Sequence, residues 1–187
     1  MGIKDTYFLD RNKAVLVVID VQEKLCRAMN PEVLATLTAN TTILLEAAKE
    51  LGLPVIATEQ YVKGLGETLD VLKTQLTSSA LEKMSFSCCG DVSFVQALTA
   101  TGRTQVIITG MEAHVCVLQT VLELRDAGLT VHVIGDAVMS RHKKNWKTGL
   151  NVMGAAGAVI TSTEAALFQL LKVAGTEEFK KLSKLVR

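Results

Sequence analysis

The sequence has few aromatic residues and no dominant charge of one sign. It contains five Phe, two Tyr and one Trp, and its 20 basic and 19 acidic residues give a formal net charge of +1. Proteins that bind nucleic acids usually concentrate basic residues on one face, and those that hold single strands add aromatic residues for stacking. Here the basic residues are scattered, apart from residues 141–147 and a Lys-rich C-terminal stretch. We therefore expect no nucleic-acid partner, and a ribonuclease is disfavoured.

Proline and cysteine are also scarce, and the cysteines are not arranged in motifs. Two prolines and a hydrophobic fraction of 49% argue against long disordered segments. The four cysteines, at positions 26, 88, 89 and 116, contain no Cys-x-x-Cys pair, and two adjacent cysteines are a poor start for a disulfide framework. We predict a cytoplasmic protein, or one in another reducing intracellular compartment.

Long apolar runs are missing as well. No segment reaches the length of a membrane span, and the first residues lack the apolar core of a secretory signal. Residues 1–6 (Met-Gly-Ile-Lys-Asp-Thr) match the short, permissive myristoylation pattern, but no second anchoring signal accompanies it. We predict no stable membrane anchor.

Strand-like runs alternate with helical patterns along the chain. Six runs predict strands: residues 14–19, 55–58, 81–86, 106–109, 129–134 and 157–160. Most of these runs are apolar throughout, as expected of a parallel sheet with helices on both faces. The predicted fold is α/β, a three-layer, Rossmann-like sandwich around a parallel sheet. It forms one domain over residues 1–187, with a core at about 14–171 and a helical tail at 175–187.

Local signals mark several helix boundaries. Asn30 followed by Pro31 predicts a helix start, and Gly52 predicts its end. Asp91 is a candidate N-cap of a later helix, and residues 161–164 (Thr-Ser-Thr-Glu) match a capping box.

Polar residues stand at or just after the carboxyl ends of the predicted strands, where ligands bind in parallel α/β folds. They are Asp20, Glu59, Gln60, Lys83, Cys116 and Asp136. Cys116 also falls within one turn of a predicted helix start, where unpaired N–H groups and the helix dipole favour a thiolate. It has a second interpretation as a small buried hydrophobic residue, because free cysteines are often buried.

A carboxylate, an amine and a thiol in one cleft form a catalytic set. Asp20 would take the proton of Cys116 and later return it to a leaving amine. Lys83 would keep Asp20 ionised, balance developing negative charge and help to orient the substrate. Asp20 has an alternative role as a turn residue, and Lys83 has one as a gatekeeper on an edge strand.

Four motifs together resemble the isochorismatase-like cysteine hydrolases. They are residues 18–22 (Val-Ile-Asp-Val-Gln), Lys83, residues 110–117 (Gly-Met-Glu-Ala-His-Val-Cys-Val) and residues 136–141 (Asp-Ala-Val-Met-Ser-Arg). They occur in the family's order and with similar spacing, over about residues 14–171. Residues 58–61 (Thr-Glu-Gln-Tyr) and 64–66 (Gly-Leu-Gly) are closest to the subgroup called isochorismatase domain-containing proteins.

The resemblance implies a six-stranded parallel sheet and a triad of Asp20, Lys83 and Cys116. It also implies a cis peptide bond before Glu112, which would turn the N–H groups of Glu112 and Cys116 into an oxyanion hole. Family members are commonly dimers or larger, so a homo-oligomer is expected.

One departure concerns metal binding. The nicotinamidase branch carries an Asp and His cluster that binds a metal, but the matching residues 59–66 contain no histidine. Because zinc and iron favour imidazole ligands, we predict no metal and no cofactor, and nicotinamidase activity is doubtful.

Candidate substrate-pocket residues are Gln22, Glu59, Gln60 and His114, although Glu59 and Gln60 would also serve simply to end a strand.

The leading hypothesis is therefore a cysteine hydrolase whose partner is a small-molecule substrate, an amide or related carbonyl compound that forms a thioester on Cys116. The alternative is a catalytically silent or redox-responsive interaction protein on the same fold, in which Cys116 reacts with oxidants. A nucleotide-binding domain is disfavoured because no Gly-x-Gly-x-x-Gly follows the first predicted strand.

Overall fold

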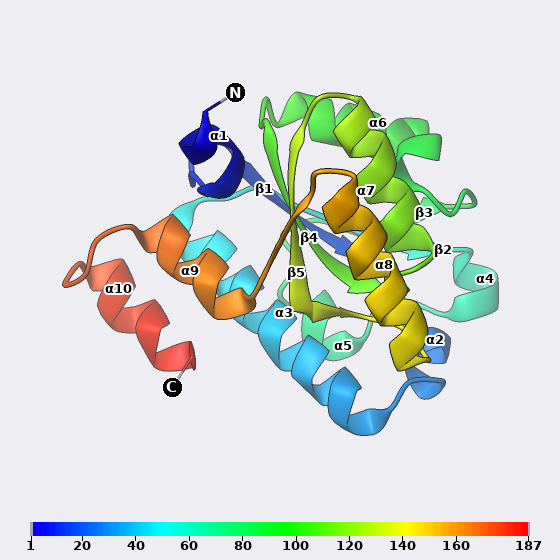
Figure 1. The fold of residues 1–187 in the computed structure, drawn as a ribbon. Coiled ribbons are helices and arrows are strands. Elements are labelled where there is room, and N and C mark those ends of the chain that lie inside the picture. The colour runs from blue at the N-terminus through cyan, green and yellow to red at the C-terminus, as the bar shows by residue number, and fades with distance from the viewer. Residues whose placement is uncertain (1, 187) are drawn as a thin grey trace.

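Within residues 2–186, which this computed structural model describes, six parallel strands form one central sheet (Figure 1). The strands are β1 (Ala14–Ile19), β2 (Val55–Gln60), β3 (Leu81–Lys83), β4 (Gln105–Met111), β5 (Thr130–Met139) and β6 (Val159–Thr161). Their order is β3-β2-β1-β4-β5-β6, and every neighbouring pair is parallel. The predicted α/β fold is confirmed. Met1 of the myristoylation-like pattern and Arg187 of the predicted tail lie outside the described residues.

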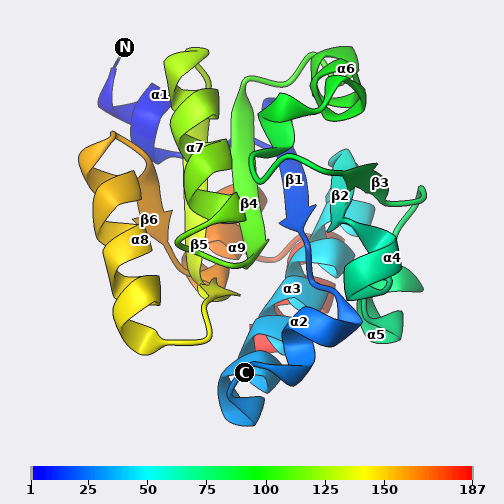
Figure 2. The same ribbon diagram turned by 90° about the vertical axis from the view of Figure 1, so that its right-hand side faces the viewer.

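Helices cover both faces of this sheet (Figure 2). One face packs against α2 (Glu23–Arg27), α3 (Pro31–Leu51), α5 (Asp70–Lys73) and α9 (Thr163–Leu171). The other packs against α6 (Val92–Ala100), α7 (Cys116–Asp126) and α8 (Lys143–Ala155). Alternate side chains of β1 enter the two cores, with Leu16 on the first face and Val17 on the second. A strand buried on both faces explains the uninterrupted apolar run at residues 14–19.

Short elements complete the chain. They are α1 (Ile3–Tyr7), α4 (Val62–Leu65), α10 (Glu177–Leu182) and two 3₁₀ turns, Cys88–Gly90 and Ser183–Val186. In α10, Leu182 packs on Ala47 of α3 and Leu167 of α9, so the predicted helical tail is attached to the core.

Most predicted helix boundaries are confirmed by their caps. Asn30 accepts hydrogen bonds from the N–H groups that open α3, and Gly52 closes it with φ of 70°. Asp91 caps α6. The cap of α9 is Ser162 rather than Thr161, because Thr161 still belongs to β6 and pairs with Ile134.

The predicted strand ends differ most from the structure at β3 and β5, while β2 and β4 continue two residues past their predicted ends, to Gln60 and Met111. β3 ends at Lys83 instead of residue 86, because the chain then turns back toward the Lys83 ammonium. β5 continues past Asp136 to Met139, since extra residues in β5 shift its register against β4 and let Val138 pair with Gly110. Asp136 itself accepts hydrogen bonds from Thr163 and so faces α9.

Candidate active site

Asp20, Lys83 and Cys116 meet at the carboxyl edge of the sheet. Asp20 directly follows β1, Lys83 ends β3, and Cys116 is the first residue of α7. The Lys83 Nζ lies 2.7 Å from Asp20 Oδ2 in an ion pair whose side chains are at most 1% exposed. The Asp20 carboxylate is also near enough to the Cys116 thiol for its charge and a side-chain interaction to raise the pKa of that thiol. The sheet thus brings together three residues that are far apart in the sequence.

The Asp20 carboxylate is held in a fixed orientation. Thr58 donates its hydroxyl to Oδ1 at 2.8 Å, while Oδ2 pairs with Lys83. The backbone of Asp20 adopts a φ of 51°, a left-handed conformation that aspartate tolerates better than most residues. Burying an ion pair has a large desolvation cost, so a buried pair is weak evidence for a stabilising role. Its position beside a thiol indicates a functional one.

The Lys83 ammonium is surrounded by oxygen atoms. In the described part of the chain, it contacts Asp20 Oδ2, Gln60 Oε1 at 2.7 Å, and the backbone carbonyls of Phe86 at 3.0 Å and Ser85 at 3.2 Å. An ammonium group carries three protons. All of them are therefore engaged inside the protein, and Lys83 acts on Asp20 from a fixed position.

The surroundings of Cys116 favour the protonated thiol over the thiolate. Burial raises its pKa to about 12, and the negative charge of Asp20 contributes in the same direction, while Lys83 opposes it. The side chain is only 7% exposed. Burial and the carboxylate therefore act against the thiolate that the helix start is expected to favour. The thiol can act as a nucleophile only if its proton leaves, and Asp20 is the acceptor in reach.

The turn before Cys116 presents free backbone donors. The Met111–Glu112 peptide bond is cis, as the resemblance implies. Among the described residues, the N–H groups of Glu112 and Cys116 have no backbone acceptor, whereas Ala113 and Val115 donate at 2.8 and 3.0 Å. Two unpaired N–H groups beside a thiol have the composition of an oxyanion hole.

Gly110 allows the turn to approach β1. Its φ is 118°, and a Cβ atom at this position would lie 2.0 Å from the carbonyl oxygen of Ile19. Only glycine fits a backbone contact of that kind.

The motif at residues 136–141 fixes the side chains of this turn. Arg141 Nε pairs with Glu112 Oε1 at 2.8 Å. His114 Nδ1 lies 3.0 Å from Ser140 Oγ, and its Nε2 lies 3.2 Å from Asn145 Nδ2. His114 precedes α7 rather than lying on it, and its role in substrate binding stays a prediction.

The other predicted pocket residues separate into two groups. Gln60 contacts Lys83, and Gln22 contacts Gln60, so both join the site. Glu59 points to the opposite face of β2, where its Oε1 accepts the N–H and hydroxyl of Thr68 at 2.6 and 2.7 Å. The structure therefore does not bring Glu59 to Cys116. Thr58 was missed by the sequence prediction, although its spacing of two from Gln60 places both on one face of β2.

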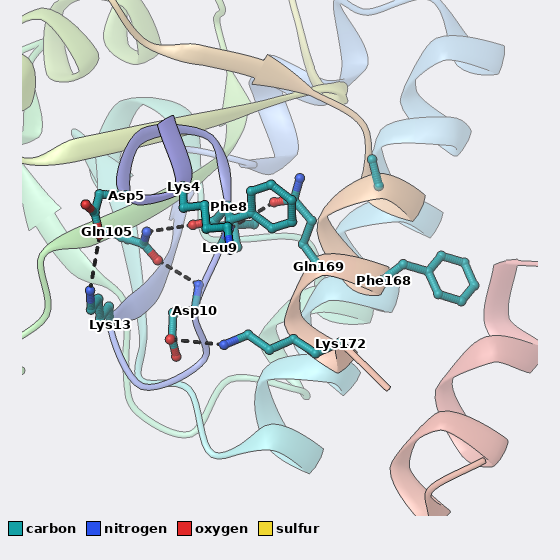
Figure 3. A pocket seen from close by; sticks show the side chains of 11 residues that line it. Lys4, Asp5, Phe8, Leu9, Asp10, Lys13, Gln105, Phe168, Gln169 and Lys172 are labelled. Carbon is teal, nitrogen blue, oxygen red and sulfur yellow. Dashed lines mark hydrogen bonds and ion pairs between the residues drawn. The ribbon is translucent and has the colours of Figure 1, made fainter. Parts of the chain in front are cut away.

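A cavity of about 590 Å³ lies at the other end of the sheet (Figure 3). It is bordered by α1 and α9 near the start of β4, with Phe8 and Phe168 among its walls and an ion pair between Asp10 and Lys172 at 3.0 Å. None of the predicted site residues, all of which the structure describes, lines it.

Metal and membrane sites were also predicted to be absent. Within residues 2–186, no group of three or more His, Cys, Asp and Glu side chains is arranged to hold a metal ion. No helix in the same range combines the length and the apolar character that crossing a membrane requires.

Comparison with known proteins identifies the family. Residues 14–165 match the isochorismatase domain. A secreted isochorismatase effector, Isc1, of Phytophthora sojae is 40% identical over 183 residues, covering 94% of this chain and 85% of the relative. Isochorismatase domain-containing protein 2 of Bos taurus is 34% identical over 176 residues, covering 93% and 83%. The chain belongs to the isochorismatase family, and the resemblance to the domain-containing subgroup is confirmed.

Solved structures agree on the fold. The MAR1 ribonuclease of Caenorhabditis elegans superposes with a TM-score of 0.88 at 35% identity, covering 96% of this chain and 92% of that one. The YcaC gene product of Escherichia coli, described as an octameric hydrolase of unknown specificity, gives 0.87 at 25% identity, covering 95% and 90%. The fold is that of an isochorismatase-family hydrolase.

Proposed function

We propose that this protein is a cysteine-dependent hydrolase that acts on a small amide or related carbonyl compound through a thioester on Cys116. The observation that supports this is the buried Asp20–Lys83 pair, whose charges act on the Cys116 thiol, next to two unpaired backbone N–H groups. Membership of the isochorismatase family supports hydrolysis as the reaction class.

In the first step, Asp20 takes the proton of Cys116 as the sulfur attacks the carbonyl carbon. The C=O π electrons move to the oxygen, which the N–H groups of Glu112 and Cys116 hold. When the tetrahedral intermediate collapses, the C–N bond breaks and Asp20 returns the proton to the leaving nitrogen. Each backbone donor of this kind contributes on the order of 3 kcal/mol to lowering the barrier.

In the second step, water attacks the thioester carbonyl and Asp20 takes its proton. The C–S bond breaks, the sulfur regains the proton, and a carboxylic acid leaves. Lys83 balances the charge of Asp20 in both steps. No metal or cofactor takes part in this scheme.

The surroundings of Cys116 disfavour the redox alternative. Oxidation by peroxides requires a thiolate, and a pKa of about 12 leaves little thiolate at neutral pH. We further propose that the protein forms a homo-oligomer and has no nucleic-acid partner. We propose the cytoplasm as its location, because it is a reducing compartment. The octameric description of the Escherichia coli neighbour supports assembly. Because the Caenorhabditis neighbour carries the name of a ribonuclease, RNA belongs in the substrate screen.

The test is a screen of small amides, esters and RNA, followed by peptide mass analysis. We expect an acyl adduct on the peptide that contains Cys116, and no adduct or turnover in C116A. Full turnover of an identified substrate by C116A or D20N would refute the mechanism.

A further inference from the structure

Resting on the proposed hydrolase, we propose that Gln60 is a positioning residue whose amide oxygen holds the Lys83 ammonium against Asp20. We further propose that Gln22 fixes the strand end that carries Gln60. Neither side chain then serves as a substrate contact.

The Gln60 amide is oriented by partners at both of its ends. Its Nε2 donates to the carbonyl of Met84 at 2.8 Å, so Oε1 is the atom that faces Lys83 Nζ at 2.7 Å. The residue is 9% exposed. Both polar atoms of the side chain thus have partners within the protein, and the amide oxygen in particular is already in use by Lys83.

Gln60 differs from the other neutral acceptors of Lys83 in its place in the chain. The carbonyls of Ser85 and Phe86 belong to the turn that follows Lys83, so they move with it. Gln60 comes from the neighbouring strand, β2. It therefore ties the ammonium to the part of the sheet that also holds Asp20, through the Thr58 hydroxyl.

Gln22 replaces a missing strand partner for Gln60. Pairing between β1 and β2 ends at Ile19 and Thr58, because the chain leaves the sheet at Asp20. Beyond that point, the Gln22 side chain accepts the Gln60 N–H at 2.7 Å and donates to the Gln60 carbonyl at 2.9 Å. The amide side chain thus makes both hydrogen bonds that a neighbouring strand would make.

The arrangement acts through Lys83 rather than on the reacting atoms. Within the described residues, Gln60 has no hydrogen bond to Asp20 or to Cys116. If Gln60 loses its amide, the ammonium is held by Asp20 and by its own turn alone. It then moves more freely, and both the orientation of Asp20 and the charge beside Cys116 become less defined.

The experiment compares Gln60→Met, Gln22→Met and the matched control Glu59→Gln. Glu59 is the preceding residue of β2 with the same 9% exposure, but it faces the other side of the sheet. The first readout needs no substrate: the rate at which iodoacetamide alkylates Cys116 between pH 8 and 10, followed by peptide mass analysis. Cys89, which has no contact with the triad, reports general loosening in the same digest. The second readout is kcat and KM on an identified substrate.

We expect Q60M to slow alkylation of Cys116 about threefold or more, because a displaced cation stabilises the thiolate less. Alkylation of Cys89 and of the E59Q protein should stay at the wild-type rate. The kcat of Q60M should fall at least tenfold with KM within twofold, and Q22M should show the same pattern more weakly. If Q60M does not fold, Gln60→Asn withdraws the amide oxygen by one methylene and gives the same test.

A change in KM alone would overturn the proposal in favour of a substrate contact. Wild-type alkylation and kcat in a less stable Q60M would overturn it in favour of a structural role. If the proposed hydrolase function is wrong, C116A keeps full activity. The alkylation rates of Cys116 in Q60M and E59Q would still show whether Gln60 positions Lys83.

Discussion

Replacing Asp20 by Asn should separate the reactivity of the Cys116 thiol from its catalysis. Asp20 raises the pKa of Cys116 through its charge and its hydrogen bond, while Lys83 lowers it. In D20N the carboxylate is gone and the cation remains without its counter-charge. The pKa of Cys116 should therefore fall, and the thiol should react faster with a neutral alkylating reagent. Hydrolysis should instead become slower, because the proton acceptor has been lost.

The size of the effect follows from the raised pKa. With a pKa of about 12, the thiolate fraction at pH 8 is on the order of 1 in 10,000. Each unit by which the substitution lowers the pKa increases that fraction about tenfold. A less basic thiolate is also less nucleophilic, and this reduces the gain in rate by about a factor of three for each unit. Alkylation should thus accelerate about threefold for each unit, whereas loss of the general base should lower kcat by about 10²–10⁴.

The assay is iodoacetamide labelling at pH 8 with peptide mass analysis, in parallel with turnover of an identified substrate. Cys89 serves as the internal control for unfolding, and N12D, an exposed substitution far from the site, serves as the control for handling. Slower labelling of Cys116 in D20N, or faster labelling of Cys89 to the same degree, would refute the electrostatic reasoning.

Three further predictions concern stability. Lys83→Met leaves the Asp20 carboxylate buried without its cation and should lower the free energy of unfolding by about 3–5 kcal/mol, measured by urea titration. The double variant K83M/D20N should recover part of that loss. If the losses of the two single variants simply add in the double variant, the two residues are not a coupled pair. Burial lowers the pKa of His132 to about 4 from 6.5, so the unfolded chain binds a proton between these values that the folded chain does not. Stability should therefore fall as the pH drops from 7 to 4, by about 3 kcal/mol more in the wild type than in His132→Leu, and equal losses would contradict this. Gly110→Ala places a methyl group against the Ile19 carbonyl and should lower the melting temperature and the soluble yield, while an unchanged melting curve would contradict the close approach.

The sequence predicted the sheet well because its signal is local. A continuous apolar run such as residues 14–19 is typical of a strand buried on both faces, and Asn30 or Asp91 marks a helix start with its own side chain. The meeting of Asp20, Lys83 and Cys116 followed from one topological rule, that parallel strands end at a common edge.

The remaining features depend on tertiary contacts. Thr58 reads as an ordinary strand residue until the structure places its hydroxyl on Asp20. β3 ends early because the backbone carbonyls of Ser85 and Phe86 turn back to accept hydrogen bonds from the Lys83 ammonium. The raised pKa of Cys116 could not be predicted from its place at a helix start, since it comes from burial and from Asp20, which is distant only in the sequence. Side chains alternate between the two faces along β2, so Glu59 and Gln60 must point to opposite faces. Which of the two faces the site could be decided only from the structure.

The most direct test of the central claim is rapid-quench analysis of a substrate during its first turnover. We predict that the amine appears before the acid, in an amount close to one per active site, while an acyl group accumulates on Cys116 and then disappears. Release of acid and amine in step, with Cys116 unmodified throughout and C116A equally active, would contradict it.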